Sequence, residues 1–403
     1  MKRYKILSLL ALTAALFLAF GCASTPKPSA EPVPVADWAR PGTWRASSPA
    51  AVSTDGTILT IKMPGVVYKP FAYYPFDGGK DVNTPYQGIS FRVRGDGSDE
   101  WACITFSNGS RFGGVYYFPV KSTDWVEYRV AFADMAPITD HTAGLPRTVP
   151  VGGFGNLIFG DKWTINSGNI PRQTFQFEVA DLKLLPEVPS KYEAAPYRPM
   201  PLDDAIAKMK KGEPVRILCF GDSITSGSGL EERRVPDRYA TLLGPALAEY
   251  YKNPNITSHC AATGGAHTFH SLGWIERDLK DGLPDVATML IGFNNCSAAQ
   301  TPEMYRKQLT MWIERLMALT QGKCAVVLIP TIPGVPRFFT QDYMAEITRE
   351  VAAEYGCAIS PMDETFKELG PFVYRDKYLV DGIHPNSAGH KLMVETLLRT
   401  LEK

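Results

Sequence analysis

The sequence carries no excess of charge of either sign. Its 42 Lys and Arg residues balance 42 Asp and Glu residues, so the formal net charge is zero. No excess of basic residues indicates a nucleic-acid partner, and no excess of acidic residues indicates a cationic partner. The chain is not short of apolar residues, at 45%, or of aromatic residues, at 11%. Disorder throughout is therefore excluded, and a globular protein without a nucleic-acid partner is expected.

Cysteines are few, seven in 403 residues, and beyond Cys22 they follow no regular spacing. A small fold stapled by disulfides is thereby excluded. The other six lie mostly in apolar runs such as 217–220, as small buried side chains do. They are Cys103, Cys219, Cys260, Cys296, Cys324 and Cys357.

Histidines number only six. His259, His267 and His270 lie close together in the sequence, but no carboxylate or cysteine pair completes a tetrahedral ligand set around them. Loop or packing histidines are therefore favoured, and the sequence predicts no metal site and no cofactor. His390, in the last helical segment, is expected at the surface.

No apolar run reaches the roughly 20 residues that a membrane-spanning helix needs. The apolar stretch 6–20 follows a basic start and resembles the core of a signal peptide. A small residue, Gly21, stands directly before Cys22, as in the lipobox of bacterial lipoproteins. We therefore expect a signal peptide over 1–21, acylation of Cys22, export and attachment to a bacterial membrane. An ordinary signal peptide with an incidental cysteine is the alternative.

The chain beyond the signal divides at two proline-rich stretches. Residues 22–35 are expected to form a tether and 187–202 a linker, because proline stiffens both and neither buries a core. The region 36–186 has alternating, β-branched and aromatic segments separated by turn dipeptides, which predict an all-β sandwich. Its expected strands are 57–63, 88–94, 101–107, 114–120, 126–132 and 175–185.

Strands and helices alternate in the last region, 203–403. Its short strands are almost wholly apolar, which is typical of a parallel sheet covered by helices on both faces. The expected strands are 215–220, 256–261, 286–291 and 325–329. The expected helices are 203–211, 237–252, 271–280, 302–320, 341–355 and 387–401. In such sheets ligands bind at the carboxyl ends of the strands.

Three groups of residues in this region suit acyl transfer. Ser223 follows Gly221 and Asp222 directly after the first strand, where glycine permits a sharp turn that exposes a serine. Asp381 stands three residues before His384, so that the carboxylate can orient the imidazole as a base for the serine. Asn294, after the third strand, offers an amide to a developing oxyanion.

Gly-Asp-Ser-Ile-Thr, a glycine block, Gly-x-Asn and Asp-x-x-His, in this order, resemble the SGNH (GDSL-type) hydrolases over about half of the chain. The resemblance implies a flavodoxin-like, doubly wound α/β domain. By it, Ser223 is the nucleophile, His384 the base and Asp381 its orienting partner. The oxyanion donors would be Asn294, the Ser223 amide and, by spacing, Gly265.

Two positions depart from the family pattern. Cys260 stands where an asparagine usually precedes the glycine block, which puts the support of the Gly265 turn in question. Asn295 stands where the family usually has aspartate. Because the oxyanion amide of Asn294 is retained, we expect Asn295→Asp to leave a folded, active enzyme.

The β domain looks like a jelly-roll carbohydrate-binding module, and some SGNH esterases join such a sandwich to the hydrolase fold. Flat aromatic rings there could stack on sugars, although adjacent ones must face opposite ways in a strand. An acylated polysaccharide or oligosaccharide is accordingly the expected partner, and a carbohydrate O-acetylesterase the expected enzyme. A lipid esterase or thioesterase and a catalytically impaired sugar-binding lipoprotein are the alternatives. The candidate sugar-binding residues are Tyr73, Tyr74, Tyr116, Tyr117 and Trp163.

Overall fold

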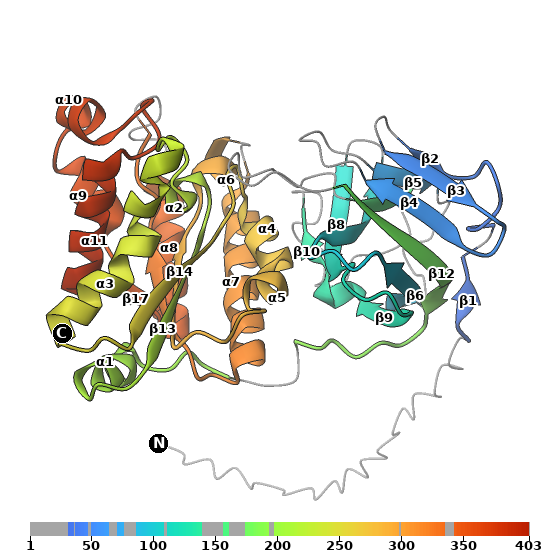
Figure 1. The fold of residues 1–403 in the computed structure, drawn as a ribbon, viewed down its shortest axis with the longest axis horizontal. Coiled ribbons are helices and arrows are strands. Elements are labelled where there is room, and N and C mark those ends of the chain that lie inside the picture. Colours follow the sequence, from blue (N-terminus) through green and yellow to red (C-terminus); the bar gives the residue numbers. More distant parts are fainter. Residues whose placement is uncertain are drawn as a thin grey trace, which may run out of the picture.

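The fold is taken from a computed structural model (Figure 1). It describes residues 31–35, 37–46, 50–63, 71–75, 86–108, 111–138, 156–160, 174–192, 197–297, 300–334 and 342–402. The predicted signal peptide, Cys22 and most of the predicted tether lie outside these ranges. Within them, no helix is both long and apolar enough to span a bilayer.

The first half consists of two antiparallel sheets packed face to face. In the first sheet the strand order is β3-β4-β12-β6-β9, and β1 pairs with β12; in the second it is β10-β8-β7-β11-β5-β2. The first sheet comprises β1 (Val33–Pro34), β3 (Ala51–Thr54), β4 (Leu59–Met63), β6 (Gly88–Gly95), β9 (Val126–Ala131) and β12 (Phe175–Leu185). The second comprises β2 (Arg45–Ala46), β5 (Phe71–Pro75), β7 (Trp101–Asn108), β8 (Arg111–Pro119), β10 (Ala136–Pro137) and β11 (Asn156–Gly160).

The core of this sandwich is aromatic. Phe91 of the first sheet meets Phe118 of the second edge to face, with ring centroids 5.3 Å apart, and Phe159 meets Phe177 at 6.5 Å. All four rings are fully buried, and the edge-to-face geometry suits the quadrupoles of aromatic rings. The antiparallel β architecture that the alternating pattern predicts is thus confirmed.

The chain joins the sandwich earlier than the proline-rich composition predicts. Val33 and Pro34 pair with Leu184 and Lys183 of β12, and the Val35 amide donates to the Leu182 carbonyl at 3.1 Å. Because β12 extends beyond its partner β4, its last residues leave backbone groups that these residues satisfy. Residues 33–35, predicted as part of the tether, therefore pair with the sandwich.

The second half contains a five-stranded parallel sheet in the order β14-β13-β15-β16-β17. Its strands are β13 (Val215–Gly221), β14 (Ile256–Ala262), β15 (Val286–Leu290), β16 (Ala325–Ile329) and β17 (Ala358–Ile359). The order places the second strand before the first and the third after it, which is the flavodoxin-like, doubly wound topology. The predicted fold class is confirmed.

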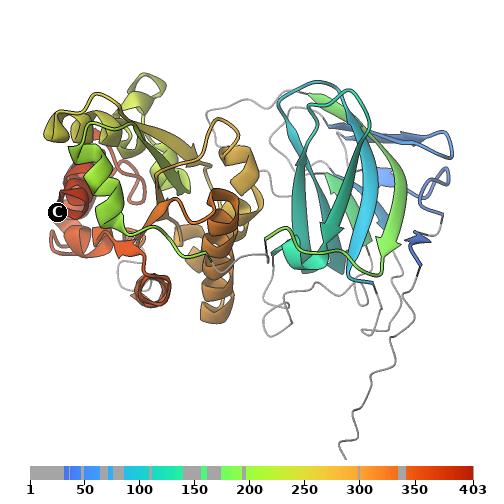
Figure 2. The same ribbon diagram turned by 90° about the horizontal axis from the view of Figure 1, so that it is seen from below.

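Helices cover both faces of this sheet (Figures 1 and 2). One face packs against α1 (Leu202–Lys210), α3 (Tyr239–Tyr251), α9 (Met362–Lys367) and α11 (Ser387–Leu401). The other packs against α4 (Thr268–Gly273), α5 (Ile275–Asp278), α7 (Pro302–Thr320) and α8 (Asp342–Tyr355). The sequence predicts α4 and α5 as one helix over 271–280, but the chain begins the turn earlier and breaks it at Trp274, whose side chain is buried.

The sandwich lies against α4, α5 and α7, so that the two halves share one apolar core (Figures 1 and 2). Tyr117 of β8 meets Trp274 edge to face, with ring centroids 5.6 Å apart. Arg315 of α7 is 4% exposed and donates to the Leu272 carbonyl at 3.0 Å and to the Asp134 carbonyl of the sandwich at 2.7 Å. The two domains are therefore packed together through a buried interface.

The proline-rich linker takes part in this interface. The Lys191 amide donates to the Asp134 carboxylate at 3.1 Å, and its ammonium group pairs with Glu276 of α5 at 2.5 Å. Further along, the Met200 amide donates to the Cys324 carbonyl at 3.0 Å. These contacts hold both ends of the described linker against the folded domains.

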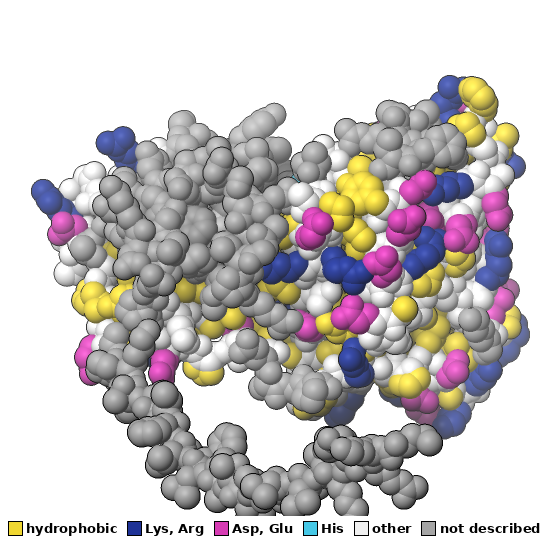
Figure 3. Space-filling model, turned by 180° about the vertical axis from the view of Figure 1, so that it is seen from behind, with side chains coloured by type: hydrophobic (Ala, Val, Ile, Leu, Met, Phe, Trp, Pro, Cys, Tyr) yellow, Lys and Arg dark blue, Asp and Glu magenta, His cyan; other side chains and the backbone are white. Residues whose placement is uncertain are grey.

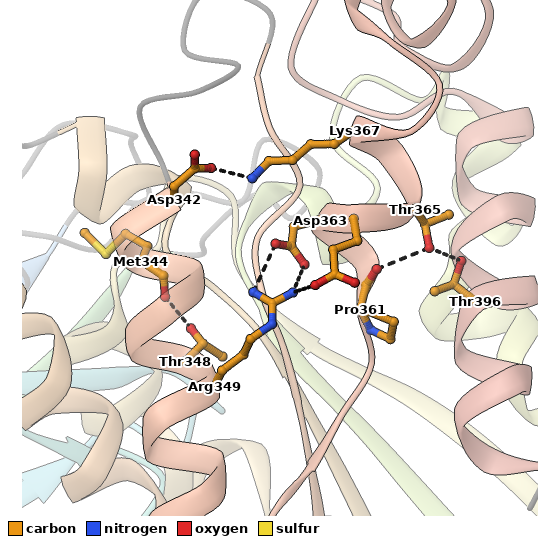
Figure 4. Close-up of polar contacts among 10 residues, drawn as sticks. Asp342, Met344, Thr348, Arg349, Pro361, Asp363, Thr365, Lys367 and Thr396 are labelled. Carbon is orange, nitrogen blue, oxygen red and sulfur yellow. Dashed lines mark hydrogen bonds and ion pairs between the residues drawn. The ribbon is translucent and has the colours of Figure 1, made fainter.

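Charges are interspersed over the surface. Figure 3 shows cationic and anionic side chains mixed on the described part of the face that it presents. In the close-up of Figure 4, Arg349 of α8 forms a two-pronged ion pair with Asp363 of α9, at 2.7 and 3.1 Å. Glu364 accepts from the same guanidinium at 2.6 Å. Asp363 is 3% exposed and the Arg349 side chain 32%, so this partly buried pair joins two helices.

Gly273 provides a test of the interface. A Cβ at this position would lie 2.6 Å from Cε2 of Tyr117, a buried ring with little room to move. Alanine in place of glycine usually stabilises a helix, but here we expect Gly273→Ala to lower the free energy of unfolding by about 1–3 kcal/mol through overpacking. Urea denaturation measures the change. In a Tyr117→Ala background the same substitution should cost little; an equal cost in both backgrounds would contradict the contact.

Candidate active site

Ser223 lies at the first residue of a short helix, α2 (Ser223–Ser226), directly after β13. The turn that carries it is crowded. A Cβ at Gly221 would lie 2.1 Å from the Thr225 hydroxyl oxygen and 2.6 Å from the Leu290 carbonyl oxygen, so only glycine fits. Asp222 is the N-cap of α2, because its Oδ1 accepts from the Ile224 amide at 3.0 Å. The predicted strand-to-helix turn is present.

The second oxygen of Asp222, Oδ2, is buried and has no hydrogen-bond partner among the described residues. Burial raises the pKa of Asp222 to about 7, against the lowering effect of the Ile224 amide. The carboxyl group next to Ser223 is therefore largely neutral in mildly acidic solution.

Gly265 and Asn294 follow β14 and β15, the two strands adjacent to β13. Gly265 has a φ of 73°, a left-handed conformation that favours glycine, in the loop after β14. Asn294 belongs to α6 (Phe293–Ser297), after β15. Its Nδ2 donates to the Ala266 carbonyl at 3.0 Å, which leaves its second amide hydrogen free of that bond and ties the two loops together. Ser223, Gly265 and Asn294 thus follow three neighbouring strands at one edge of the sheet.

His384 and Asp381 come from the loop before α11. His384 Nδ1 donates to Asp381 Oδ2 at 2.7 Å, while Asp381 Oδ1 accepts from the Ile383 amide at 3.0 Å and the His384 amide at 2.8 Å. Partial burial works to raise the pKa of Asp381, but the hydrogen bonds from His384 and Ile383 outweigh it and keep the pKa below its usual value. An ionised Asp381 fixes the tautomer that leaves Nε2 of His384 able to accept a proton.

This loop is placed beside the serine turn. Gly229, six residues after Ser223, has a φ of 90°, and a Cβ there would lie 2.9 Å from Cβ of His384. The loop is held at its base, because the Asn386 side chain caps α11 by accepting from the Gly389 amide at 3.0 Å. The predicted pair therefore packs directly on the chain that follows the nucleophile candidate.

A buried tyrosine and histidine support the serine turn, and the sequence analysis missed both. The Tyr239 hydroxyl bonds the Thr225 hydroxyl at 2.9 Å, and the Tyr239 amide donates to Nδ1 of His390 at 3.3 Å. His390 is fully buried, and burial lowers its pKa to about 3, so it remains neutral as an acceptor. The expectation that His390 lies at the surface is wrong: its ring faces α3. Its position among the apolar residues of an amphipathic helix was the available signal.

The two departures from the family pattern have structural answers. The thiol of Cys260 contacts the Thr225 carbonyl at 3.7 Å, and the glycine loop is closed by the Ala266 amide, which donates to Thr263 at 3.1 Å. Asn295 is fully buried, and its Oδ1 accepts from both the amide and the hydroxyl of Thr268 at 3.3 Å. Its Nδ2 donates to Gln300. An ionised carboxylate cannot make this last bond, so Asn295→Asp would lose a buried hydrogen bond that the sequence does not indicate.

The predicted sugar-binding aromatics are only partly described. Tyr117 is 4% exposed and faces the hydrolase half, so its ring is not available to a sugar. Tyr116 points the other way in the strand, and its hydroxyl accepts from Lys191 at 3.3 Å. Trp163 and the side chains of Tyr73 and Tyr74 lie outside the described residues. The sheet that carries Tyr117 is thus an interface rather than an open face.

The three histidines considered as metal ligands lie in different surroundings. His259 is exposed on β14, while the His267 and His270 rings lie 5.5 Å apart at the N-terminal end of α4. The His267 amide donates to Nδ1 of His270 at 2.9 Å, which is a helix-capping contact. Among the residues that the structure describes, no three His, Cys, Asp or Glu side chains gather as metal ligands would.

Asp222 gives a pH-dependent prediction. Its folded-state pKa of about 7 exceeds the ordinary 3.8, so the folded protein holds a proton that the unfolded chain loses as pH rises. The free energy of unfolding therefore falls as pH rises from about 4 to about 7, by up to about 1.4 kcal/mol per pH unit. Relative to wild type, Asp222→Asn should gain stability over that window in urea denaturation. Asp203→Asn, at an exposed carboxylate, is the control; a gap that stays constant with pH would contradict the buried titration.

Comparisons with known proteins bear on the region that carries this site. Residues 219–392 match the model of the GDSL-like Lipase/Acylhydrolase family. An acetylxylan esterase from Xylanibacter ruminicola is 26% identical over 221 residues, an alignment that covers 48% of this chain and 44% of the relative. The chain thus covers less than half of that protein's length.

Solved structures match a similar share of the chain. An alpha/beta hydrolase from the metagenome of Lake Arreo is 21% identical, with a TM-score of 0.39 over 47% of this chain and 95% of that one. An acetylxylan esterase from Geobacillus stearothermophilus is 18% identical, with a TM-score of 0.39 over 47% and 94%. The matched family model and the five-stranded parallel sheet together identify the C-terminal half of the chain as a GDSL-type (SGNH) hydrolase domain.

Proposed function

We propose that the protein is a serine esterase that removes O-acetyl groups from a plant-type polysaccharide such as xylan. The observation that carries the proposal is the Asp381–His384 pair, bonded at 2.7 Å, in a loop that packs on the chain just after Ser223. This is the arrangement that acyl transfer requires: a hydroxyl, a base and a carboxylate that orients the base.

In the proposed reaction, Oγ of Ser223 attacks the acetyl carbonyl carbon while Nε2 of His384 takes its proton. Asp381 stabilises the imidazolium that forms. The tetrahedral oxyanion accepts hydrogen bonds from the amides of Ser223 and Gly265 and from Nδ2 of Asn294. The ester C–O bond then breaks, His384 protonates the sugar oxygen, and a water molecule releases acetate from Ser223 by the same steps.

The substrate class rests on two supports. The relative from Xylanibacter ruminicola is an acetylxylan esterase, and the β-sandwich fused to the hydrolase domain resembles a carbohydrate-binding module in its sequence. A signal peptide ending at Gly21 and acylation at Cys22 would place the enzyme outside the cytoplasm on a membrane, where polymeric or oligomeric substrates are met. Long-chain lipids and thioesters are the competing acyl donors.

Single substitutions test the catalytic assignment. Ser223→Ala and His384→Ala should each abolish nearly all acetate release from acetylated xylooligosaccharide, and the double variant should be no worse, because the residues act as one unit. His259→Ala, at an exposed histidine, should keep wild-type turnover. Full activity in Ser223→Ala would refute the nucleophile. Faster turnover of a long-chain ester or an acyl thioester would instead assign the site to the competing substrates.

Asn294 tests the oxyanion hole separately. Removing its amide withdraws a donor that strengthens mainly in the transition state, so Asn294→Ala should lower kcat by about 100-fold with little change in KM. Steady-state kinetics on a chromogenic acetyl ester measure both constants. A rise in KM at unchanged kcat would show that Asn294 binds the substrate's ground state instead.

A further inference from the structure

A chain of buried side-chain amides, joined by hydrogen bonds, connects the proposed oxyanion hole with the β-sandwich. Asn295 Nδ2 donates to Oε1 of Gln300, and Gln300 Nε2 donates to Oε1 of Gln308 at 3.1 Å. Gln308, on α7, ends the chain by donating from Nε2 to the carbonyl of Pro137 at 2.7 Å. Asn295 and Gln308 are fully buried and Gln300 is 9% exposed. The chain therefore crosses the domain interface out of contact with bulk water.

Its direction is fixed by its ends. Pro137 presents a backbone carbonyl, which only accepts, so Gln308 must donate to it and can then only accept from Gln300. Because Gln300 donates to Gln308 through its nitrogen, its oxygen faces Asn295, and Asn295 must therefore donate to it. An ionised aspartate at 295 would place acceptors at both ends of a series of two amides, and one buried junction would then bring two oxygen atoms face to face. This is a physical reason for asparagine at the position where the family usually has aspartate.

The inner end of the chain holds both oxyanion segments. Through its other oxygen, Asn295 accepts from the amide and hydroxyl of Thr268, three residues after Gly265. Its neighbour Asn294 donates to Ala266 of the same loop. The orientation of the Asn295 side chain thus sets how the Gly265 loop lies against Asn294.

We propose that the Pro137 carbonyl of the β-sandwich and Gln308 of α7 act as positioning groups for the oxyanion hole, through Gln300 and Asn295. The inference rests on the proposed esterase function for its kinetic consequence. On this proposal the sandwich influences catalysis itself. A sandwich that only delivered the enzyme to a polymer would not affect turnover of a small soluble ester.

The test substitutes Gln308 in the full-length protein. Gln308→Met keeps the volume but removes both hydrogen bonds, so Asn295 and Gln300 lose their fixed orientation. We expect kcat on a small acetyl ester to fall about 10- to 100-fold with KM nearly unchanged, as for a misplacement of catalytic groups. Thr320→Val, which removes a buried hydroxyl at the far end of the same helix, is the matched control and should keep the wild-type kcat.

Hydrogen exchange gives a readout that does not depend on activity. Amides in 262–270 and 293–297 should exchange faster in Gln308→Met than in wild type or Thr320→Val. Wild-type exchange and kcat in Gln308→Met would overturn the inference. If wild-type protein releases no acetate, the proposed function fails, while the exchange data still decide whether the chain holds these segments.

A second variant guards against misfolding. Gln308→Glu has the same shape, and in its protonated form it can still donate to Pro137 and accept from Gln300. Its kcat relative to wild type should therefore fall as pH rises and the acid ionises. A ratio of one at every pH would also overturn the inference.

Asn295→Asp, with its carboxyl group ionised, should show the same loss of kcat as Gln308→Met.

Discussion

The burial of α4 and α7 beneath the β-sandwich is the constraint on which the rest of the structure depends. These helices cover one face of the parallel sheet, and their outer surface would meet water in an isolated hydrolase domain. Tyr117 of the sandwich covers that surface instead, and Arg315 of α7 bonds the Asp134 carbonyl of the sandwich. Since α4 begins three residues after Gly265, the packing of the two domains reaches the candidate site through a single short helix.

The sequence predicted the fold well where local pattern and burial agree. The strands β15 and β16 and the helices α7 and α11 lie where their apolar patterns predict them. A strand covered on both faces is apolar throughout, so its pattern is easy to recognise. The serine turn and the Asp381–His384 loop were also predictable, since each is a local motif whose spacing dictates its geometry.

Features that depend on distant partners could not be predicted. The helical pattern of α11 could indicate that His390 is buried, but not that its ring accepts from the backbone of α3. The amide chain joins residues 295, 300 and 308 to 137, and nothing in their sequence separation indicates contact. The proline-rich linker has the composition of a spacer, yet Lys191 bonds both domains, because composition says how stiff a segment is and not where it docks.

The contact between Gly273 and the ring of Tyr117 has a consequence for how such proteins diversify. Modules joined only by a peptide can be exchanged by recombination at the gene level, since each brings its own complete surface. Here a residue without a side chain on one domain matches an aromatic ring on the other. A sandwich from another protein would leave the space over Gly273 unfilled or would clash with it. The two halves are therefore expected to have been inherited together, with substitutions on one side answered on the other.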